Sequence, residues 1–230
     1  MQLRISLISL GLLGLLLLLS IWPGGTLGNW NWGLLSATIL TVALAGFFWQ
    51  FERRQNSIVQ LSLIATISSL AALSRIAFVP VAGLQPATFI IMITGYVFGS
   101  QTGFLVGAIS ALVSNFFLGQ GPWTPWQMLA WGICGLLASG LGQTLSAFRL
   151  FPFAVICTAA AFLFGWITNI SYWSSFVHPL NCSSYLGTCI ASFPFDLIHA
   201  AGNLAFSLLF GTHFYQLLFR FHAKMSGYRQ

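Results

Sequence analysis

Long apolar runs separated by short polar breaks recur along the whole chain. Each run is close to the roughly 20 residues that an α-helix needs to cross the hydrocarbon core of a bilayer. Lipid offers no hydrogen-bond partner to a backbone N–H or C=O, so such runs fit helices. The pattern therefore predicts an all-α polytopic membrane protein with about eight transmembrane helices. The expected spans are 4–22, 33–51, 56–79, 86–100, 102–118, 125–146, 152–173 and 194–219.

The composition supports this class and argues against soluble ones. Hydrophobic residues make up 57% of the chain and charged residues 4%, whereas an ordinary soluble domain carries about 25% charged residues. No polar stretch is long enough for a sizeable soluble domain. The sequence also lacks a Gly-rich loop followed by Lys and Ser/Thr that would cradle a phosphate. Energy for active transport would therefore come from an ion gradient or from a partner subunit.

The distribution of basic residues predicts the orientation in the membrane. Apart from Arg75, Lys and Arg lie on one side of the expected spans. The segments 23–32, 80–85, 119–124 and 174–193 on the other side contain neither. Short cytoplasmic loops accumulate Lys and Arg, so both termini are expected to be cytoplasmic. The net charge of +6 is thus a topology signal, and no nucleic-acid partner is needed to explain it.

Three parts of the chain are expected. Residues 1–55 would form two N-terminal transmembrane helices with a cytoplasmic FERR loop, 56–220 a six-helix core, and 221–230 a basic cytoplasmic tail. The first run, 4–22, is long for a cleaved signal peptide, so we expect it to be retained as a helix.

Two formally charged residues fall away from the cytoplasmic side, Arg75 and Asp196. Arg75 lies about 30 Å along a helix from Arg54, which places it near the outer end of its span. Asp196 begins the last span on the same side. Charges at membrane depth face the interior of a bundle, where these two can pair with each other or with a ligand. An acid just after Pro194 in a first helical turn also complements the helix dipole, and that explanation of Asp196 stays open.

Asp196 also begins a polar stripe. His199, Asn203 and Ser207 follow it at spacings of three and four residues, which places them on one face of a helix. A polar face is costly against lipid, so this stripe is expected to line a cavity or a helix contact. Histidine titrates near neutral pH, so His199 can be a proton carrier or a structural hydrogen-bonding group.

Other polar side chains are expected at the same depth as Arg75. Buried amides beside aromatic rings orient ligands in small-molecule pockets, although a single Asn at a helix end more commonly satisfies backbone groups. Their convergence on one level favours a pocket. The candidate binding residues are Arg75, Gln85, Asn115, Gln120, Trp123, Asn169, Tyr172, Asp196, His199 and Asn203. With two acidic residues in the chain and no nucleophile elbow, neither a metal site, a cofactor nor an enzyme is expected.

The segment "FFLGQGPWTPWQM", residues 116–128, interrupts the apolar pattern. Its "TPWQ" fits a reciprocal helix cap, in which Thr124 is the N-cap and the side chain of Gln127 reaches back to the backbone N–H of Thr124. That cap leaves Gln120 and Gly121 unexplained. We therefore expect a ligand contact at Gln120 rather than at Gln127.

Cysteines fall into two groups. Cys134 and Cys157 lie inside expected spans and are interpreted as small core residues. Cys182 and Cys189 share the expected outer segment, where either a disulfide or two unpaired thiols fits the sequence.

Two faces of small residues are expected to let helices approach closely, by packing within the protein or against a partner subunit. They consist of Ser62, Ala65, Thr66, Ser69 and Ala72 in the third span, and of Gly99, Gly103, Gly107 and Ala111 in the fifth. Internal packing is the default expectation for both faces, especially for the glycines.

The order "SNFFLGQGPWTPWQMLAWG", preceded by "GFLVGAISALV" and followed by "FPFDLIHA", resembles the substrate-binding S components of energy-coupling factor (ECF) transporters over about residues 50–220. It is similar to a branch of that family sometimes linked by name to cobalamin or its precursors. The resemblance implies a six-helix core and a pocket for a vitamin-like molecule near the outer face. It also implies, as partners, a transmembrane coupling subunit and two ATPase subunits in the cell membrane of a prokaryote.

The resemblance further implies a docking surface on the first core helix, where the family often carries alanines four residues apart. Here Ala65 is followed by Ser69, and Ser68 by Ala72, which are small enough to serve but are not that alanine pair. The leading hypothesis is a non-catalytic subunit that captures a vitamin or a vitamin precursor. The alternative is a stand-alone secondary transporter driven by protons through Asp196 and His199.

Overall fold

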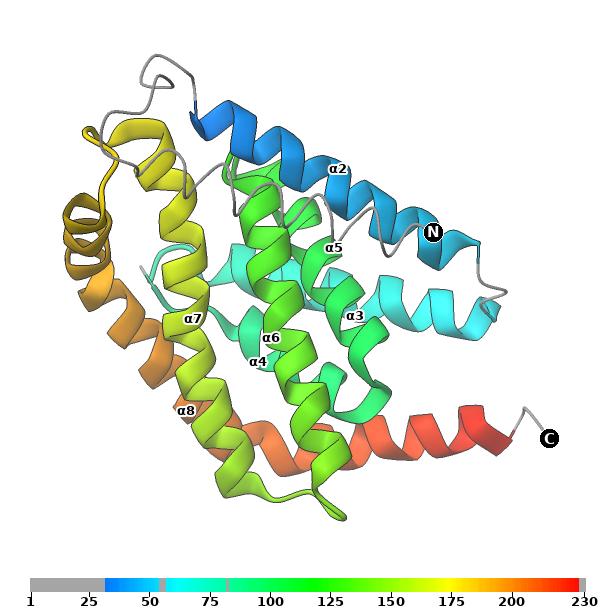
Figure 1. The fold of residues 1–230 in the computed structure, drawn as a ribbon. Helices are drawn as coiled ribbons and strands as arrows, with labels where there is room; N and C mark the ends of the chain where they lie inside the picture. The colour runs from blue at the N-terminus through cyan, green and yellow to red at the C-terminus, as the bar shows by residue number, and fades with distance from the viewer. Residues whose placement is uncertain (1–31, 54–56, 82, 228–230) are drawn as a thin grey trace.

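The computed structural model describes residues 32–53, 57–81 and 83–227, and the regular structure in these ranges is helical. The expected first span, 4–22, lies outside the described residues. Seven helices follow one another along the described chain (Figure 1). They are α2 (Trp32–Glu52), α3 (Ile58–Ala77), α4 (Pro86–Phe98), α5 (Ser100–Leu118), α6 (Thr124–Thr144), α7 (Leu150–Phe176) and α8 (Cys182–Gly227).

The helices are built for a membrane. By length and composition, α3, α5, α7 and α8 could each cross a bilayer, and α2 and α4 contain shorter apolar stretches. The all-helical polytopic class is thus confirmed for the described part of the chain, with four to six candidate spans. The total of eight spans and the cytoplasmic placement of both termini stay predictions.

Local chemistry sets several helix boundaries. The side chain of Ser57 accepts a hydrogen bond from the backbone N–H of Gln60 at 3.2 Å and so caps the start of α3. Pro86 opens α4, where its missing N–H costs no helical bond. Gly99 separates α4 from α5 with φ at 90°, a backbone conformation that favours glycine. It therefore lies before α5 and does not continue the glycine face within that helix.

Glycines bring α4, α5 and α6 into backbone contact. A Cβ added to Gly95 would overlap the carbonyl of Gly135, and one added to Gly135 would overlap the carbonyl of Gly103. Gly107 lies against the backbone of α6 in the same way. Lipid tails are as apolar as side chains, so such close packing is what holds membrane helices together. Internal packing is thus confirmed for Gly103 and Gly107.

The small residues of α3 face two different sides. Ser68 and Ala72 are buried, and the hydroxyl of Ser110 on α5 donates to the carbonyl of Ser68 at 3.3 Å. Ala65 and Ser69 are exposed. Ser68 and Ala72 therefore pack within the chain, and the surface open to a partner carries Ala65 and Ser69.

The expected outer loop 174–193 is mostly wrong. α7 continues to Phe176, and α8 begins at Cys182 and runs for 46 residues through Pro194. The first part of α8 packs on α7, where the Tyr185 hydroxyl donates to the Trp166 carbonyl at 2.9 Å. A proline is tolerated inside a membrane helix when neighbouring groups compensate for the lost hydrogen bond.

The length of α8 also decides the state of two cysteines. Cys182 and Cys189 are seven residues apart on one helix, which separates them by about 10 Å along its axis. Disulfides join residues whose Cα atoms lie within about 7 Å. Both thiols are free, as are the buried Cys134 and Cys157.

The second half of α8 runs along the end of the bundle opposite the α7–α8 connection (Figure 1). Tyr215 stacks on Phe148 in the α6–α7 connection, with ring centroids 4.3 Å apart. Phe214 meets Phe89 of α4 at 5.5 Å. α2 packs on α7 and α6 from the front in Figure 1.

The glycine contact between α5 and α6 yields a stability prediction. We expect Gly135→Leu to lower the free energy of unfolding by about 1–3 kcal/mol or more, because its side chain would collide with the backbone of α5. Thermal unfolding of the purified protein in detergent measures the change. Gly140→Leu is the control, because Gly140 on the same helix borders open space. Equal losses for both variants would contradict the role of the contact.

Candidate substrate-binding site

Arg75 lies in the last turn of α3 and is held by neutral oxygens from α5 and α6. Its Nη1 donates to Ser114 Oγ and to Asn115 Oδ1, both at 2.6 Å. Its Nη2 donates to Gln127 Oε1 at 3.4 Å. A cation in a membrane protein needs such partners, and hydrogen bonds from a charged donor are stronger than neutral ones.

Asn115 is positioned by α6. Its Nδ2 donates to Thr124 Oγ1 at 2.9 Å and to Gln127 Oε1 at 2.8 Å, while its Oδ1 accepts from Arg75. Both amide hydrogens and the carbonyl oxygen are therefore engaged, which fixes the orientation of the amide. The prediction that Asn115 and Arg75 lie at one level is confirmed by their direct contact.

The reciprocal cap expected for "TPWQ" is wrong. α6 begins at Thr124, its N-cap residue is Trp123, and no side chain caps it. The side chain of Gln127 points instead toward Asn115 and Arg75. An amide oxygen that accepts a hydrogen bond from a partly buried cation contributes more to stability than one that caps a helix end. Gln127 therefore belongs to the Arg75 cluster, although the sequence motif predicted that it would cap the helix end.

Gln120 and Trp123 stabilise the turn between α5 and α6. Gln120 donates from Nε2 to the Leu112 carbonyl at 3.0 Å and accepts from Thr124 Oγ1 at 2.9 Å. Trp123 donates from Nε1 to the Gly119 carbonyl at 3.3 Å. Both residues therefore have a structural task, and a ligand contact at either stays a prediction.

Trp131 joins the Arg75 cluster to α8. The guanidinium carbon of Arg75 lies 5.0 Å from the centre of the fully buried Trp131 ring, which also stacks on Phe164 at 4.7 Å. The indole N–H donates to Thr88 Oγ1 at 2.8 Å. Thr88 Oγ1 in turn shares a 2.7 Å hydrogen bond with His199 Nε2. A continuous series of contacts thus runs from α3 through α6 and α4 to α8.

The polar stripe of α8 faces the protein interior, as its spacing predicts. Asp196, His199, Asn203 and Ser207 are all buried. Asn203 donates from Nδ2 to the Cys157 carbonyl of α7 at 3.0 Å, but its Oδ1 is buried without a hydrogen-bond partner. A buried acceptor without a donor is a group that a ligand or a water molecule can satisfy.

Asp196 lies on the α7 side of the stripe. Its Oδ2 accepts from Ser192 Oγ at 3.2 Å, and Ser192 Oγ accepts from Asn169 Nδ2 at 2.7 Å. Its carboxylate packs against Gly165, where a Cβ would overlap it. Among the described residues no ion pair joins Asp196 to Arg75, because each charge is held by neutral groups of its own neighbours.

The helix-dipole explanation of Asp196 is also wrong. It requires Asp196 to lie in a first helical turn, and α8 begins at Cys182. Asp196 is therefore an acid within a long helix, and its neighbours are hydroxyl and amide groups.

The two other candidates lie apart from one another. Gln85 precedes α4, and its Oε1 is buried without a hydrogen-bond partner. The adjacent Leu84 contacts Gly202, so this connection lies on α8 beside the polar stripe. Tyr172 is 57% exposed beside Phe176 on the surface of α7, outside the buried cluster.

Comparison with known families assigns the chain to a class. A family model described as "ECF-type riboflavin transporter, S component" matches residues 54–191, more than half of the 230-residue chain. The chain belongs to the S components of ECF-type transporters. Comparisons with curated proteins and with solved structures found no match.

Several expectations follow from membership among the S components. S components are non-catalytic binding subunits in the membranes of prokaryotes, so this chain is a multi-pass membrane protein and not an enzyme. The link to cobalamin is not supported, because the matching model names riboflavin. The matched range includes the Arg75 cluster but ends before Asp196, and α2 precedes it.

The hydroxyl of Thr88 yields a prediction for this S component. Thr88→Val keeps the shape but leaves Trp131 Nε1 and His199 Nε2 without their shared partner. We expect the free energy of unfolding to fall by about 1–3 kcal/mol for each polar group left unpaired. Denaturant unfolding in detergent measures it. Thr38→Val is the matched control, since its hydroxyl donates to a carbonyl at an exposed position, and a loss as large as that of Thr88→Val would contradict the assignment.

Proposed function

We propose that this S component captures riboflavin and delivers it to an ECF-type importer. The family model supports the vitamin, because it names riboflavin over residues 54–191. The structural observation that supports the proposal most directly is the Oδ1 of Asn203 on the polar stripe of α8, which is buried without a hydrogen-bond partner. The unpartnered Oε1 of Gln85 lies on the connection that packs on the same part of α8.

These two oxygens suit the chemistry of riboflavin. A flavin ring offers an N–H, and the ribityl chain offers hydroxyl groups, all of which donate hydrogen bonds. A buried acceptor without a hydrogen bond costs about 1–3 kcal/mol, so a ligand that supplies the donor gains this energy on binding. Aromatic side chains such as Phe164 and Trp131 provide the apolar surroundings that a flat ring requires.

The Arg75 cluster supports a neutral ligand with carbonyl oxygens. The guanidinium already has neutral acceptors in Ser114, Asn115 and Gln127, so it does not demand an anion. The carbonyl oxygens of a flavin ring are acceptors of the same kind as the amide oxygens that surround Arg75. A rearrangement of Arg75 from an amide oxygen to a ligand oxygen would therefore change its environment little.

Uptake would require partners. The sequence has no phosphate-binding loop, so we propose that energy comes from two ATPase subunits through a membrane coupling subunit, as the family implies. The exposed small residues Ala65 and Ser69 on α3 would let that subunit approach the helix backbone.

Binding tests the vitamin. Riboflavin fluorescence should be quenched on titration with the purified protein, and Asn203→Leu should weaken binding about tenfold by removing the acceptor. Gln216→Leu, at an exposed position of the same helix, is the control and should bind as the unchanged protein does. If riboflavin does not bind the unchanged protein, the vitamin is wrong, and mass spectrometry of co-purifying small molecules would identify the ligand.

Co-purification tests the docking surface. We expect replacement of both Ala65 and Ser69 by Trp to abolish co-purification with a co-expressed coupling subunit, because bulky side chains would hold the two helices apart. Leu70→Trp, at another exposed position of the same helix, should leave co-purification intact. Riboflavin binding should persist in all variants, which separates docking from folding. Undiminished co-purification of the double variant would remove the surface from the proposal.

A further inference from the structure

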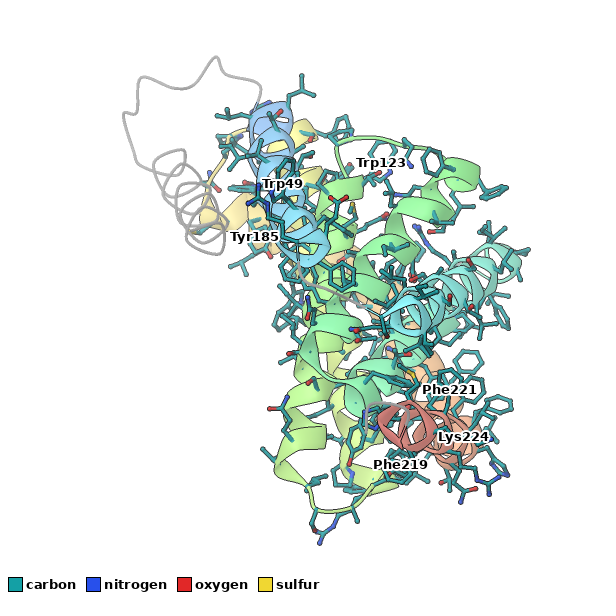
Figure 2. All side chains as sticks on the ribbon, turned by 90° about the vertical axis from the view of Figure 1, so that its right-hand side faces the viewer. Trp49, Trp123, Tyr185, Phe219, Phe221 and Lys224 are labelled. Carbon is teal, nitrogen blue, oxygen red and sulfur yellow. The ribbon has the colours of Figure 1, made fainter. Side chains whose placement is uncertain are left out.

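A cavity of about 450 Å³ lies between α2 and the turn that joins α5 to α6. Leu44, Ala45 and Phe48 of α2 form one wall, and Leu112 and Met128 contribute to the opposite one. Its volume falls in the range of about 300–1,000 Å³ that small-molecule sites occupy. In Figure 2, α2 with Trp49 and the turn with Trp123 lie at the same end of the molecule.

The chemistry of the lining is uncharged and largely apolar. On α2, the Thr41 hydroxyl donates to the Ala37 carbonyl of its own helix at 2.7 Å. The other polar groups gather at the turn, where the Gly121 N–H donates to Thr124 Oγ1 at 3.3 Å and Thr124 Oγ1 donates to Gln120 Oε1 at 2.9 Å. These groups are committed to one another. Gln120 Nε2 gives one hydrogen to the Leu112 carbonyl, and its amide has a second hydrogen to donate. The cavity thus presents mainly hydrocarbon, with an amide donor at the turn.

The surroundings of the cavity are suited to lipid. α2 exposes Leu34, Val42 and Trp49, each by more than half of its surface, and the end of α5 exposes Phe116 and Phe117 by 72% each. In a multi-pass membrane protein such surfaces face acyl chains. A hydrocarbon chain can therefore enter the cavity from the bilayer without crossing water.

We propose that this cavity binds the acyl chain of a neutral glycerolipid, with an ester carbonyl accepting a hydrogen bond from Gln120. A charged headgroup would find no counter-charge in the lining, and the hydroxyls of a vitamin would find almost no free partner there. The bound chain fills the space between α2 and the helices that carry the substrate site. One wall of the cavity belongs to α2, which precedes the residues that match the family model. Asn203, Gln85 and Arg75, on which the proposed capture of riboflavin rests, do not line the cavity, so the lipid site is separate from it.

Photo-crosslinking tests the site. The full chain is reconstituted into phosphatidylcholine liposomes that contain a monoacylglycerol with a diazirine on its acyl chain, irradiated, and mapped by peptide mass spectrometry. Crosslinks are expected at Leu44 and Phe48 of α2 and at Leu112 or Met128 of the opposite wall. Two substitutions that fill the cavity from opposite walls, Ala45→Phe and Leu112→Trp, should each lower labelling about tenfold.

Val42→Phe is the matched control, because Val42 is exposed on α2 and does not line the cavity. It should leave labelling unchanged. Crosslinks at Val42 and Trp49 as strong as those at the lining residues would overturn the proposal. The crosslink map of the wild-type protein decides this point even if a variant fails to fold. Loss of labelling on addition of riboflavin would also overturn it, since the cavity would then belong to the vitamin.

Discussion

The positive charge of Arg75 is the constraint around which one end of the bundle is arranged. The chain contains two acidic residues, and neither pairs with Arg75 among the described residues, so neutral oxygens must surround the guanidinium. Those oxygens come from the end of α5 and the start of α6, which fixes how the two helices meet. The same cation lies over Trp131, and through that ring the arrangement extends to α4 and α8.

The polar network can form only because the helices that carry it are close together. Gly103 on α5 and Gly135 on α6 meet backbone to backbone, one helical turn beyond Trp131. Larger residues there would separate α5 from α6, and with them Asn115 from Gln127. The glycine contact has no polar atom of the site in it, yet it determines the distances on which the site depends.

Sequence reasoning succeeded where a single helix decides the outcome. The hydropathy pattern predicted the helical membrane class, and the spacing of His199 and Asn203 predicted that both lie on one buried face. It failed where a partner on another helix competes with a local rule. The side chain of Gln127 meets Arg75 on α3 instead of capping α6. For Asp196 the reverse holds: one of its expected partners was Arg75 on another helix, and it accepts a hydrogen bond from Ser192, one turn earlier on its own helix.

The other error was to predict that the last helix begins at Pro194. Pro194 resembles the start of a helix, but contacts with α7 keep Cys182–Gly227 helical as one element. At 1.5 Å per residue, the path along the axis of its 46 residues is about 70 Å long, more than twice the roughly 30 Å of bilayer hydrocarbon. Figure 1 shows how this length is accommodated: α8 bends, and its second half runs across the end of the bundle instead of continuing the line of its first half. Although it bends and contains Pro194, α8 is one helical element from Cys182 past the basic Arg220 and Lys224, so two sides of the bundle are joined without an intervening loop.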